Sequence, residues 1–137
     1  MLEDLQKRRD QKNRSQQRRY YSADGRPKQS FKTARRRATL KGLEFTITLD
    51  WMVDQIAKQE GRCAMTGILF DYTKDRRYTK HPYSLSLDRI DNAQGYTPDN
   101  TRVVCAMYNY CKNVARDEDV DFFAWQLIQH KFGTRPK

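Results

Sequence analysis

Apolar residues recur at helical spacing in four stretches of this chain. The clearest is 49–60, where Leu49, Met52, Val53 and Ile56 fall at positions i, i+3, i+4 and i+7, with Thr48 before them as a candidate N-cap. Similar spacing, ended by glycine or begun by polar residues, predicts further helices over 31–41, 106–116 and 120–131. We expect the last helix to face inward with Val120, Phe123, Leu127 and Ile128.

Two short segments carry the pattern of strands. Residues 84–90 alternate, so that Leu85, Leu87 and Arg89 share one face while Ser86 and Asp88 share the other. A polar loop follows, and residues 101–105 then form a second, apolar strand. The order strand, loop, strand, helix predicts an antiparallel hairpin backed by a helix, within an α+β fold.

Composition shifts divide the chain further. Polar and basic residues fill 1–29, where we expect disorder or a helix that forms only on a partner. Residues 71–82 are polar and irregular, which predicts a loop. The expected organisation is a basic arm, a helical lead-in, a central unit and a C-terminal helix packed on that unit, over 1–29, 30–62, 63–116 and 117–137.

Positive charge is concentrated at one end of the chain. The formal net charge is +10, and residues 1–40 hold 13 Lys and Arg against 4 Asp and Glu. A basic arm joined to a balanced domain is typical of proteins that bind the phosphate backbone of nucleic acids, although a solvated tail has the same composition. In the helix at 31–41, Phe31, Ala34, Ala38 and Leu40 could face inward, and the basic residues expected outside are Arg35, Arg36, Arg37 and Lys41.

Several classes of protein are disfavoured. No apolar run approaches the ~20 residues that span a bilayer, and the first residues lack the apolar segment of a signal peptide, so we expect a cytosolic protein without membrane contact. The three cysteines, Cys63, Cys105 and Cys111, are an odd number and lack a fourth ligand for tetrahedral zinc. Free thiols are expected, and a structural zinc is not.

Two oxygen-bearing side chains stand out within the predicted hairpin and helix. Asp88 ends the first strand, and Asn109 lies in the helix that follows the second. A hairpin backed by a helix can bring these two groups together as hard oxygen ligands for Mg²⁺, with waters and phosphate oxygens filling the other positions. The alternative is structural, because Asp and Asn side chains often bond the backbone of turns.

The motifs GRCAMTG, SLDRIDN, GYTPDN and VVCAMYNYCK occur in this order between Gly61 and Lys112. Together they resemble the HNH (ββα-metal) endonucleases, especially the small phage-type members. The resemblance implies a ββα-metal core, one divalent ion, Mg²⁺ or Mn²⁺, held by Asp88 and Asn109, and a middle asparagine, Asn100, that ties the loop together by backbone hydrogen bonds. Lys112, one helical turn after Asn109, is expected to meet a phosphate.

Arg89 departs from the family pattern, in which a histidine beside the aspartate activates water. An arginine has a pKa above ~12 and cannot accept the proton, although it can contact phosphate or stabilise developing charge. Another group would then be the base: His81, Tyr83, Tyr96 or a metal-bound hydroxide. His81 would lie ~23 Å from Asp88 along a straight strand and reaches the site only if the chain folds back.

The resemblance therefore implies an endonuclease that hydrolyses DNA phosphodiester bonds and leaves a 5′-phosphate and a 3′-hydroxyl. One such site cuts one strand, so nicking of double-stranded DNA is expected. Two alternatives remain open: a non-catalytic nucleic-acid-binding protein on a degenerate HNH fold, and a nuclease subunit that depends on a partner.

Overall fold

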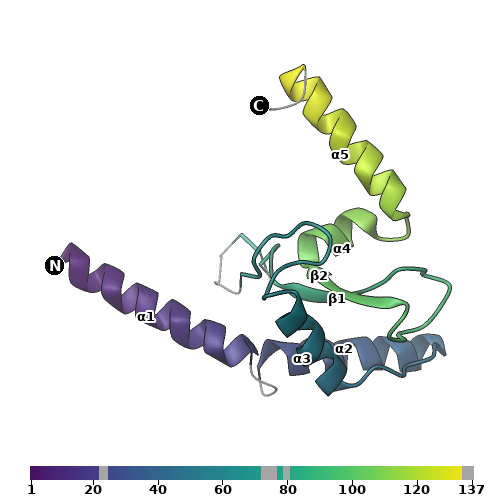
Figure 1. Ribbon diagram of the computed structural model, residues 1–137, viewed down its shortest axis with the longest axis horizontal. Helices are drawn as coiled ribbons and strands as arrows, with labels where there is room; N and C mark the ends of the chain where they lie inside the picture. The colour runs from purple at the N-terminus through teal and green to yellow at the C-terminus, as the bar shows by residue number, and fades with distance from the viewer. Residues whose placement is uncertain (22–24, 72–76, 79–80, 134–137) are drawn as a thin grey trace.

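The computed structural model describes residues 1–21, 25–71, 77–78 and 81–133 (Figure 1). Residues 72–76 and 79–80 of the predicted loop lie outside this part, as do residues 22–24 and 134–137. The elements in chain order are α1 (Leu2–Tyr21), α2 (Arg26–Lys41), α3 (Leu49–Lys58), β1 (Leu85–Arg89), β2 (Thr101–Cys105), α4 (Ala106–Lys112) and α5 (Asp117–Phe132). The α+β class predicted from the sequence is confirmed.

The centre of the molecule is the hairpin of β1 and β2 with α4 folded back over it. The strands pair antiparallel, with Leu85 opposite Cys105 and Asp88 opposite Arg102. Helix α4 begins directly after β2, and the backbone N–H of Ala106 donates to the carbonyl of Ser84 at 2.8 Å. The first turn of α4 therefore lies against the start of β1, as the predicted ββα unit requires.

The hairpin separates two helical layers. Figure 1 shows α2 and α3 on one side of it and α4 on the other. The core is made largely of side chains from the hairpin, α2 and α3, because these elements present apolar faces to each other. Its buried members include Ala34, Ala38, Met52, Ile56, Phe70, Leu85, Leu87, Val103 and Val104.

Local signals explain where the two core helices begin and end. The hydroxyl of Thr48 accepts a hydrogen bond from the N–H of Trp51 at 3.1 Å, which confirms the predicted cap of α3. Gly42 ends α2 in the left-handed conformation, with φ of 64°. The predicted start of α2 is wrong: the helix begins at Arg26 because Pro27 fits the first turn, and Ser30 lies inside it.

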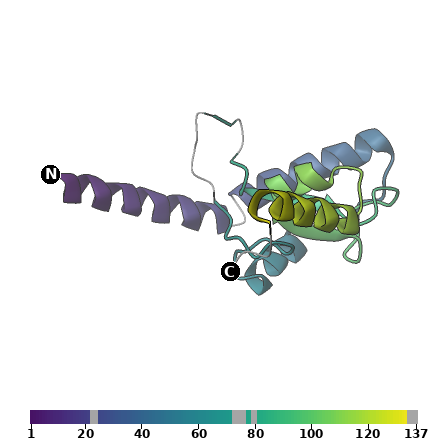
Figure 2. The ribbon, with the colours of Figure 1, turned by 90° about the horizontal axis from the view of Figure 1, so that it is seen from above.

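The N-terminal arm forms α1 and then continues into α2. Figures 1 and 2 both show α1 extending away from the rest of the molecule. Leu2 and Leu5 are exposed, so these apolar residues do not anchor the helix to the core. The described part of this arm is helical, and the dependence of that helix on a partner stays a prediction.

The C-terminal helix differs from the prediction. Figure 1 shows α5 projecting from the core beyond α4. Val120 packs against the core, but Phe123 and Leu127, which were expected inward, are 62% and 45% exposed. The expectation that this segment packs on the central unit is therefore wrong for the rest of α5, because the helix leaves the core after its first turn.

The three cysteines are reduced. Cys63 and Cys105 are buried side by side, while Cys111 is exposed. The backbone N–H of Cys105 donates to Sγ of Cys63 at 3.2 Å. The hydrogen bond from the Cys105 thiol lowers the pKa of Cys63, and the same bond raises the pKa of Cys105.

Among the helices of the described residues, none has the length and apolar character that a membrane span requires.

Candidate active site

Asp88 occupies the penultimate position of β1 and is only 2% exposed. Hairpin register places Arg102 directly opposite, and its Nε donates to Oδ2 of Asp88 at 2.9 Å. Lys112, from α4, places Nζ 3.2 Å from Oδ1. A buried carboxylate needs such partners to remain ionised, and here two cations supply them.

Lys112 does not face solvent. It is 0% exposed and donates a second hydrogen bond, at 2.8 Å, to the carbonyl of Arg89. The prediction that Lys112 meets a phosphate is therefore wrong for this conformation, because burial closes the ammonium off from any external anion. Lys112 does lie one helical turn after Asn109, as predicted, but its side chain points toward the end of β1.

Arg102 also bonds Asp117, the first residue of α5. Its Nη1 and Nη2 donate to the two carboxylate oxygens at 3.0 and 2.6 Å, a bidentate pair. The Tyr108 hydroxyl donates to the same carboxylate, and the Arg102 guanidinium lies 5.6 Å from the centre of the Tyr108 ring. Asp88 is thus connected to the start of α5 through Arg102.

Hydrogen bonds and burial within this network shift the pKa values of three of its residues. The hydrogen bond from Arg102 lowers the pKa of Asp117, against the opposing effect of burial. Burial of Arg102 alone would lower its pKa, but its bonds to Asp117 and Asp88 raise the pKa overall. Burial, and then the bond to Asp117, raises the pKa of Tyr108. Arg102 and Asp117 therefore keep their charge, and Tyr108 keeps its proton, near neutral pH.

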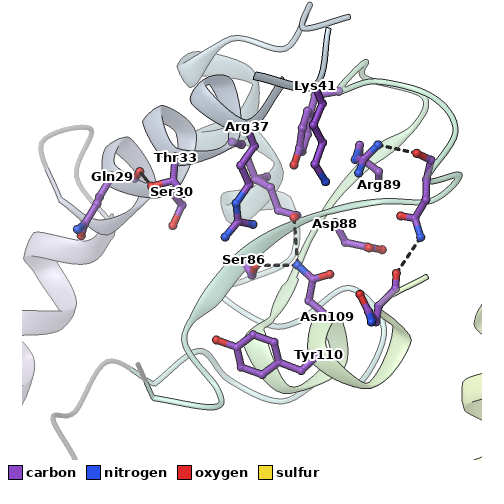
Figure 3. A pocket seen from close by; sticks show the side chains of 15 residues that line it. Gln29, Ser30, Thr33, Arg37, Lys41, Ser86, Asp88, Arg89, Asn109 and Tyr110 are labelled. Atoms are coloured by element: carbon purple, nitrogen blue, oxygen red, sulfur yellow. Dashed lines mark hydrogen bonds between the residues drawn. The ribbon is translucent and has the colours of Figure 1, made fainter. Parts of the chain in front are cut away.

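The amide of Asn109 is fixed by its nitrogen. Nδ2 donates to Oγ of Ser86 at 2.9 Å and to the carbonyl of Leu87 at 3.2 Å. The side chains of Asn109 and Asp88 line the same groove (Figure 3). The two oxygen-bearing groups chosen from the sequence therefore lie on the same side of the hairpin, and Asp88 is almost fully buried there.

Arg89 is used to hold the loop that follows β1. Its Nη1 donates to the carbonyls of Asn92 and Gln94 at 2.7 and 2.9 Å. The guanidinium lies 5.4 Å from the centre of the Tyr96 ring. Arg89 is thus a loop anchor whose remaining N–H groups border a groove.

Asn100 ties the same loop from its other end. Nδ2 donates to the carbonyls of Asp91 and Gly95 at 3.0 and 2.8 Å, and Oδ1 accepts from the N–H of Asp91 at 2.9 Å. These bonds are the backbone contacts that the resemblance implied for this residue. Gly95 is required here because a Cβ would lie 2.1 Å from the carbonyl oxygen of Glu44.

A groove of about 600 Å³ runs between α2, the end of β1 and α4 (Figure 3). Asp88, Arg89 and Asn109 line one side, and Arg37 and Lys41 line the side formed by α2. Asn92 and Asn113 also line the groove, and the Asn92 amide donates to the Asn113 carbonyl at 2.8 Å. The groove is therefore an open polar channel with cations facing oxygen donors.

The arginine run of α2 is divided by this geometry. Arg37 lines the groove, whereas Arg35 and Arg36 do not. The guanidinium of Arg35 lies 5.5 Å from the centre of the Phe31 ring, on another part of the helix. Three consecutive positions point about 100° apart around a helix, so a run of three cannot share one face.

His81 is not brought to the groove. Its Nδ1 accepts from the N–H of Tyr83 at 3.1 Å, and Nε2 lies 3.6 Å from the Asp71 carboxylate. His81 and Tyr83 are absent from the described residues that line the groove, while Tyr96 lines it beneath Arg89. The structure gives no support to His81 as an alternative base.

Asp88 and Asn109 are the two oxygen donors at the groove that could hold a magnesium-type ion. Each carboxylate oxygen has two acceptor positions, and among the described residues Oδ1 of Asp88 is bonded to Lys112 alone. The Asn109 oxygen is the second donor, and such sites take their other ligands from water and phosphate. No group of three or more His, Cys, Asp or Glu side chains in the described ranges could hold a metal, so a closed all-protein cage is not offered.

The fold and the groove together define an HNH-like ββα protein. The chain is similar in structure to the rare-cutting HNH restriction endonuclease PacI, with a TM-score of 0.55 and 20% sequence identity over 81% of this chain and 84% of that chain. No protein-family model and no curated protein sequence matches the chain. The HNH-like fold implied by the motifs is confirmed at the level of structure.

Sequence patterns do not single out Arg102, Asp117 or Tyr108. Arg102 is the one charged residue in an otherwise apolar strand, and the hairpin register places it opposite Asp88. That combination is a usable signal, because a charge in a buried strand needs a partner on the neighbouring strand.

Proposed function

We propose that this protein is a metal-dependent endonuclease that cuts one strand of duplex DNA at the groove between α2, β1 and α4. The observation that carries the proposal is the placement of Asp88 and Asn109 across the groove from Arg37 and Lys41, within an HNH-like fold. Oxygen donors on one wall and cations on the other suit a phosphodiester, which needs both.

Each wall has its own task. Arg37 and Lys41 would hold the non-bridging oxygens of the DNA backbone, since both are exposed and project from one face of α2. Asp88 and Asn109 would hold the ion, which when bound polarises the phosphate and stabilises the leaving oxygen. Arg89 would hold the loop at the edge of this site through the two bonds of its Nη1.

Arg102 and Lys112 act behind this site. They fix the Asp88 carboxylate in one orientation, and Lys112 also fixes the end of β1 through the Arg89 carbonyl. Precise placement of a ligand by neighbouring hydrogen bonds commonly changes metal affinity or activity 10–100-fold. Both residues are therefore positioning residues in this proposal.

The direct test is a supercoiled plasmid incubated with the full chain at low salt, with Mg²⁺ or Mn²⁺ added. Conversion to the open-circular form is expected with either ion and not with EDTA. Asp88→Asn keeps the side-chain shape but removes the charge and should abolish nicking while DNA binding persists. Intact plasmid in both metals at high protein concentration would refute the enzymatic proposal.

A second candidate function is nucleic-acid binding without cleavage. It is favoured by one observation: Arg89 stands where the family has a general base and is engaged by two loop carbonyls. Among the described residues lining the groove there is no histidine. Salt-sensitive retention of a duplex oligonucleotide, without nicking in any metal, would select this function.

A further inference from the structure

Helix α1 is strongly basic and extends away from the core. Its 20 residues contain seven Lys and Arg against three Asp and Glu. Residues 2–12 are all exposed, including Leu2 and Leu5, the apolar residues of this stretch. Most helices in proteins are stabilised by packing of an apolar face. Packing of these residues on the core therefore does not explain the helix.

The charges of α1 are arranged by side. Glu3 lies in the first turn, where the helix dipole favours a carboxylate. Asp10 accepts a hydrogen bond from the amide of Gln6 at 3.1 Å. Arg8 and Lys12 are exposed and form no ion pair with a described residue. Because successive residues turn by about 100°, Arg8 and Lys12 share one side of the helix and Asp10 lies on the other.

Helix α1 adjoins one end of the groove. The groove-lining residues of α2 run from Gln29 to Lys41, a length of about 18 Å at 1.5 Å per residue (Figure 3). Figures 1 and 2 both show α1 and α2 end to end, with α1 beyond the start of α2. A duplex that follows α2 along the groove and continues past Gln29 therefore meets α1 next.

We propose that α1 is a second DNA-binding surface, which lies along the phosphate backbone of the duplex on one side of the cut. The inference rests on the proposed function, which places the cut in the groove. Exposed cations without ion-pair partners suit phosphates, since binding them releases the condensed counterions of DNA. An anionic membrane fits less well, because α1 has no apolar face to enter the headgroup region.

The length of α1 sets how much DNA it covers. Its 20 residues span about 30 Å, or roughly nine base pairs at 3.4 Å each. Groove and helix together reach about 48 Å, or roughly 14 base pairs. A duplex of 8 base pairs, about 27 Å long, cannot contact both surfaces at once.

Fluorescence anisotropy of the full chain in EDTA measures DNA binding without any cleavage. Arg8→Gln with Lys12→Gln removes two cations from one side of α1 and introduces good helix formers. Binding to a 24-base-pair duplex should weaken at least tenfold. The slope of log K against log salt should become shallower by about 1.8, because each phosphate contact contributes about 0.9.

The matched control is Lys58→Gln with Lys131→Gln, which removes the same charge from exposed positions of α3 and α5. Its affinity should stay within about twofold of wild type, with an unchanged salt slope. If the α1 variant behaves like this control, the proposal is overturned. Loss of binding to anionic vesicles, with DNA binding unchanged, would instead make a membrane the partner of α1.

Duplex length and nicking kinetics locate the surface. On an 8-base-pair hairpin duplex, the effect of the two α1 substitutions should shrink to less than about threefold, and an equal loss on both lengths would overturn the end-to-end arrangement. With Mg²⁺, the α1 variant should nick at an unchanged rate at saturating DNA and need at least tenfold more DNA to reach half that rate. Binding in EDTA that depends on α1, without nicking in any metal, would refute the proposed function alone.

Discussion

Lys112 Nζ lies 3.2 Å from Oδ1 of Asp88, and both side chains are closed off from solvent, at 0% and 2% exposure. The lysine also satisfies the carbonyl of Arg89, so it joins α4 to the end of β1 by two bonds. This pair makes the candidate metal ligand part of the folded core. A substitution that alters the environment of Asp88 is therefore expected to change the stability of the protein as well as any metal binding by Asp88.

The first prediction follows from that pair. Lys112→Met removes a buried cation and leaves Asp88 with Arg102 alone, and breaking a buried pair on one side typically costs about 3–5 kcal/mol of unfolding free energy. Lys58→Met is the control, because Lys58 pairs with Asp54 on the surface and such pairs contribute about 0–1 kcal/mol. Urea unfolding of both variants measures the difference, and equal losses would show that the buried pair has no special weight.

A second prediction concerns the order in which metal and DNA bind. Arg37, Lys41 and Arg89 border the groove, and Asp88 is already paired with two cations, so the empty groove has excess positive charge. Bound phosphate supplies the missing negative charge. The affinity for Mn²⁺, measured by electron paramagnetic resonance, should rise on the order of tenfold or more when an uncleavable phosphorothioate duplex is present.

The control for this second prediction is Asp88→Asn in the same titration. Loss of the carboxylate should abolish the DNA-dependent gain in Mn²⁺ affinity. A wild-type affinity that is the same with and without DNA would contradict the electrostatic argument.

A third prediction separates neighbours in the arginine run of α2. Arg37→Ala removes a cation from the groove, and Arg36→Ala removes one from the same helix outside it. At saturating DNA, Arg37→Ala should lower the nicking rate about 10²-fold, because the non-bridging oxygens that Arg37 holds carry the charge that develops at the phosphate during cleavage. Arg36→Ala should leave that rate within about twofold while weakening binding at moderate salt. Equal rates for the two variants would remove α2 from the site.

A fourth prediction uses the depressed pKa of Asp117. A carboxylate with a lower pKa in the folded state stabilises the protein above its unfolded pKa, near 3.8, and loses that contribution as pH falls through the folded value. Asp117→Asn should therefore be less stable than wild type at pH 6, and the gap should narrow as pH falls below about 3.8. Thermal unfolding of both proteins at several pH values measures this difference in stability. A difference that does not change with pH would show that it does not come from the charge of Asp117.

Local patterns predicted much of the fold. Thr48 as a cap, Gly42 as a terminator and the strand over residues 101–105 all follow from a few neighbouring residues, and the structure has each of them. The loop role of Asn100 followed from its match to a motif. Such features depend on short-range chemistry, which the sequence displays directly.

The remaining features depend on tertiary position. Burial of Lys112 needs the distance between α4 and the end of β1, and the pairing of Arg102 with Asp117 needs the path of the chain after α4. The exposure of Phe123 and Leu127 could not be predicted from the sequence. An apolar helix has the same spacing of residues whether it packs on its own core or on another molecule. Periodicity gives the face of a helix but not what meets it.

The final prediction tests the meaning of Arg89. Arg89→His breaks the two bonds to the carbonyls of Asn92 and Gln94, which should lower the unfolding free energy by about 1–3 kcal/mol. It also places an imidazole beside the groove, and a neutral imidazole can take a proton from water near pH 7. We therefore expect faster nicking, with a rate that rises between about pH 6 and 7 as the imidazole loses its proton.

Arg89→Ala is the matched control, because it loses the same loop bonds and gains no base, so its nicking rate should not rise. A decrease in nicking for both variants would instead show that the arginine itself stabilises the reacting phosphate. This protein would then use a cation at the position where the HNH endonucleases that its motifs resemble have a base.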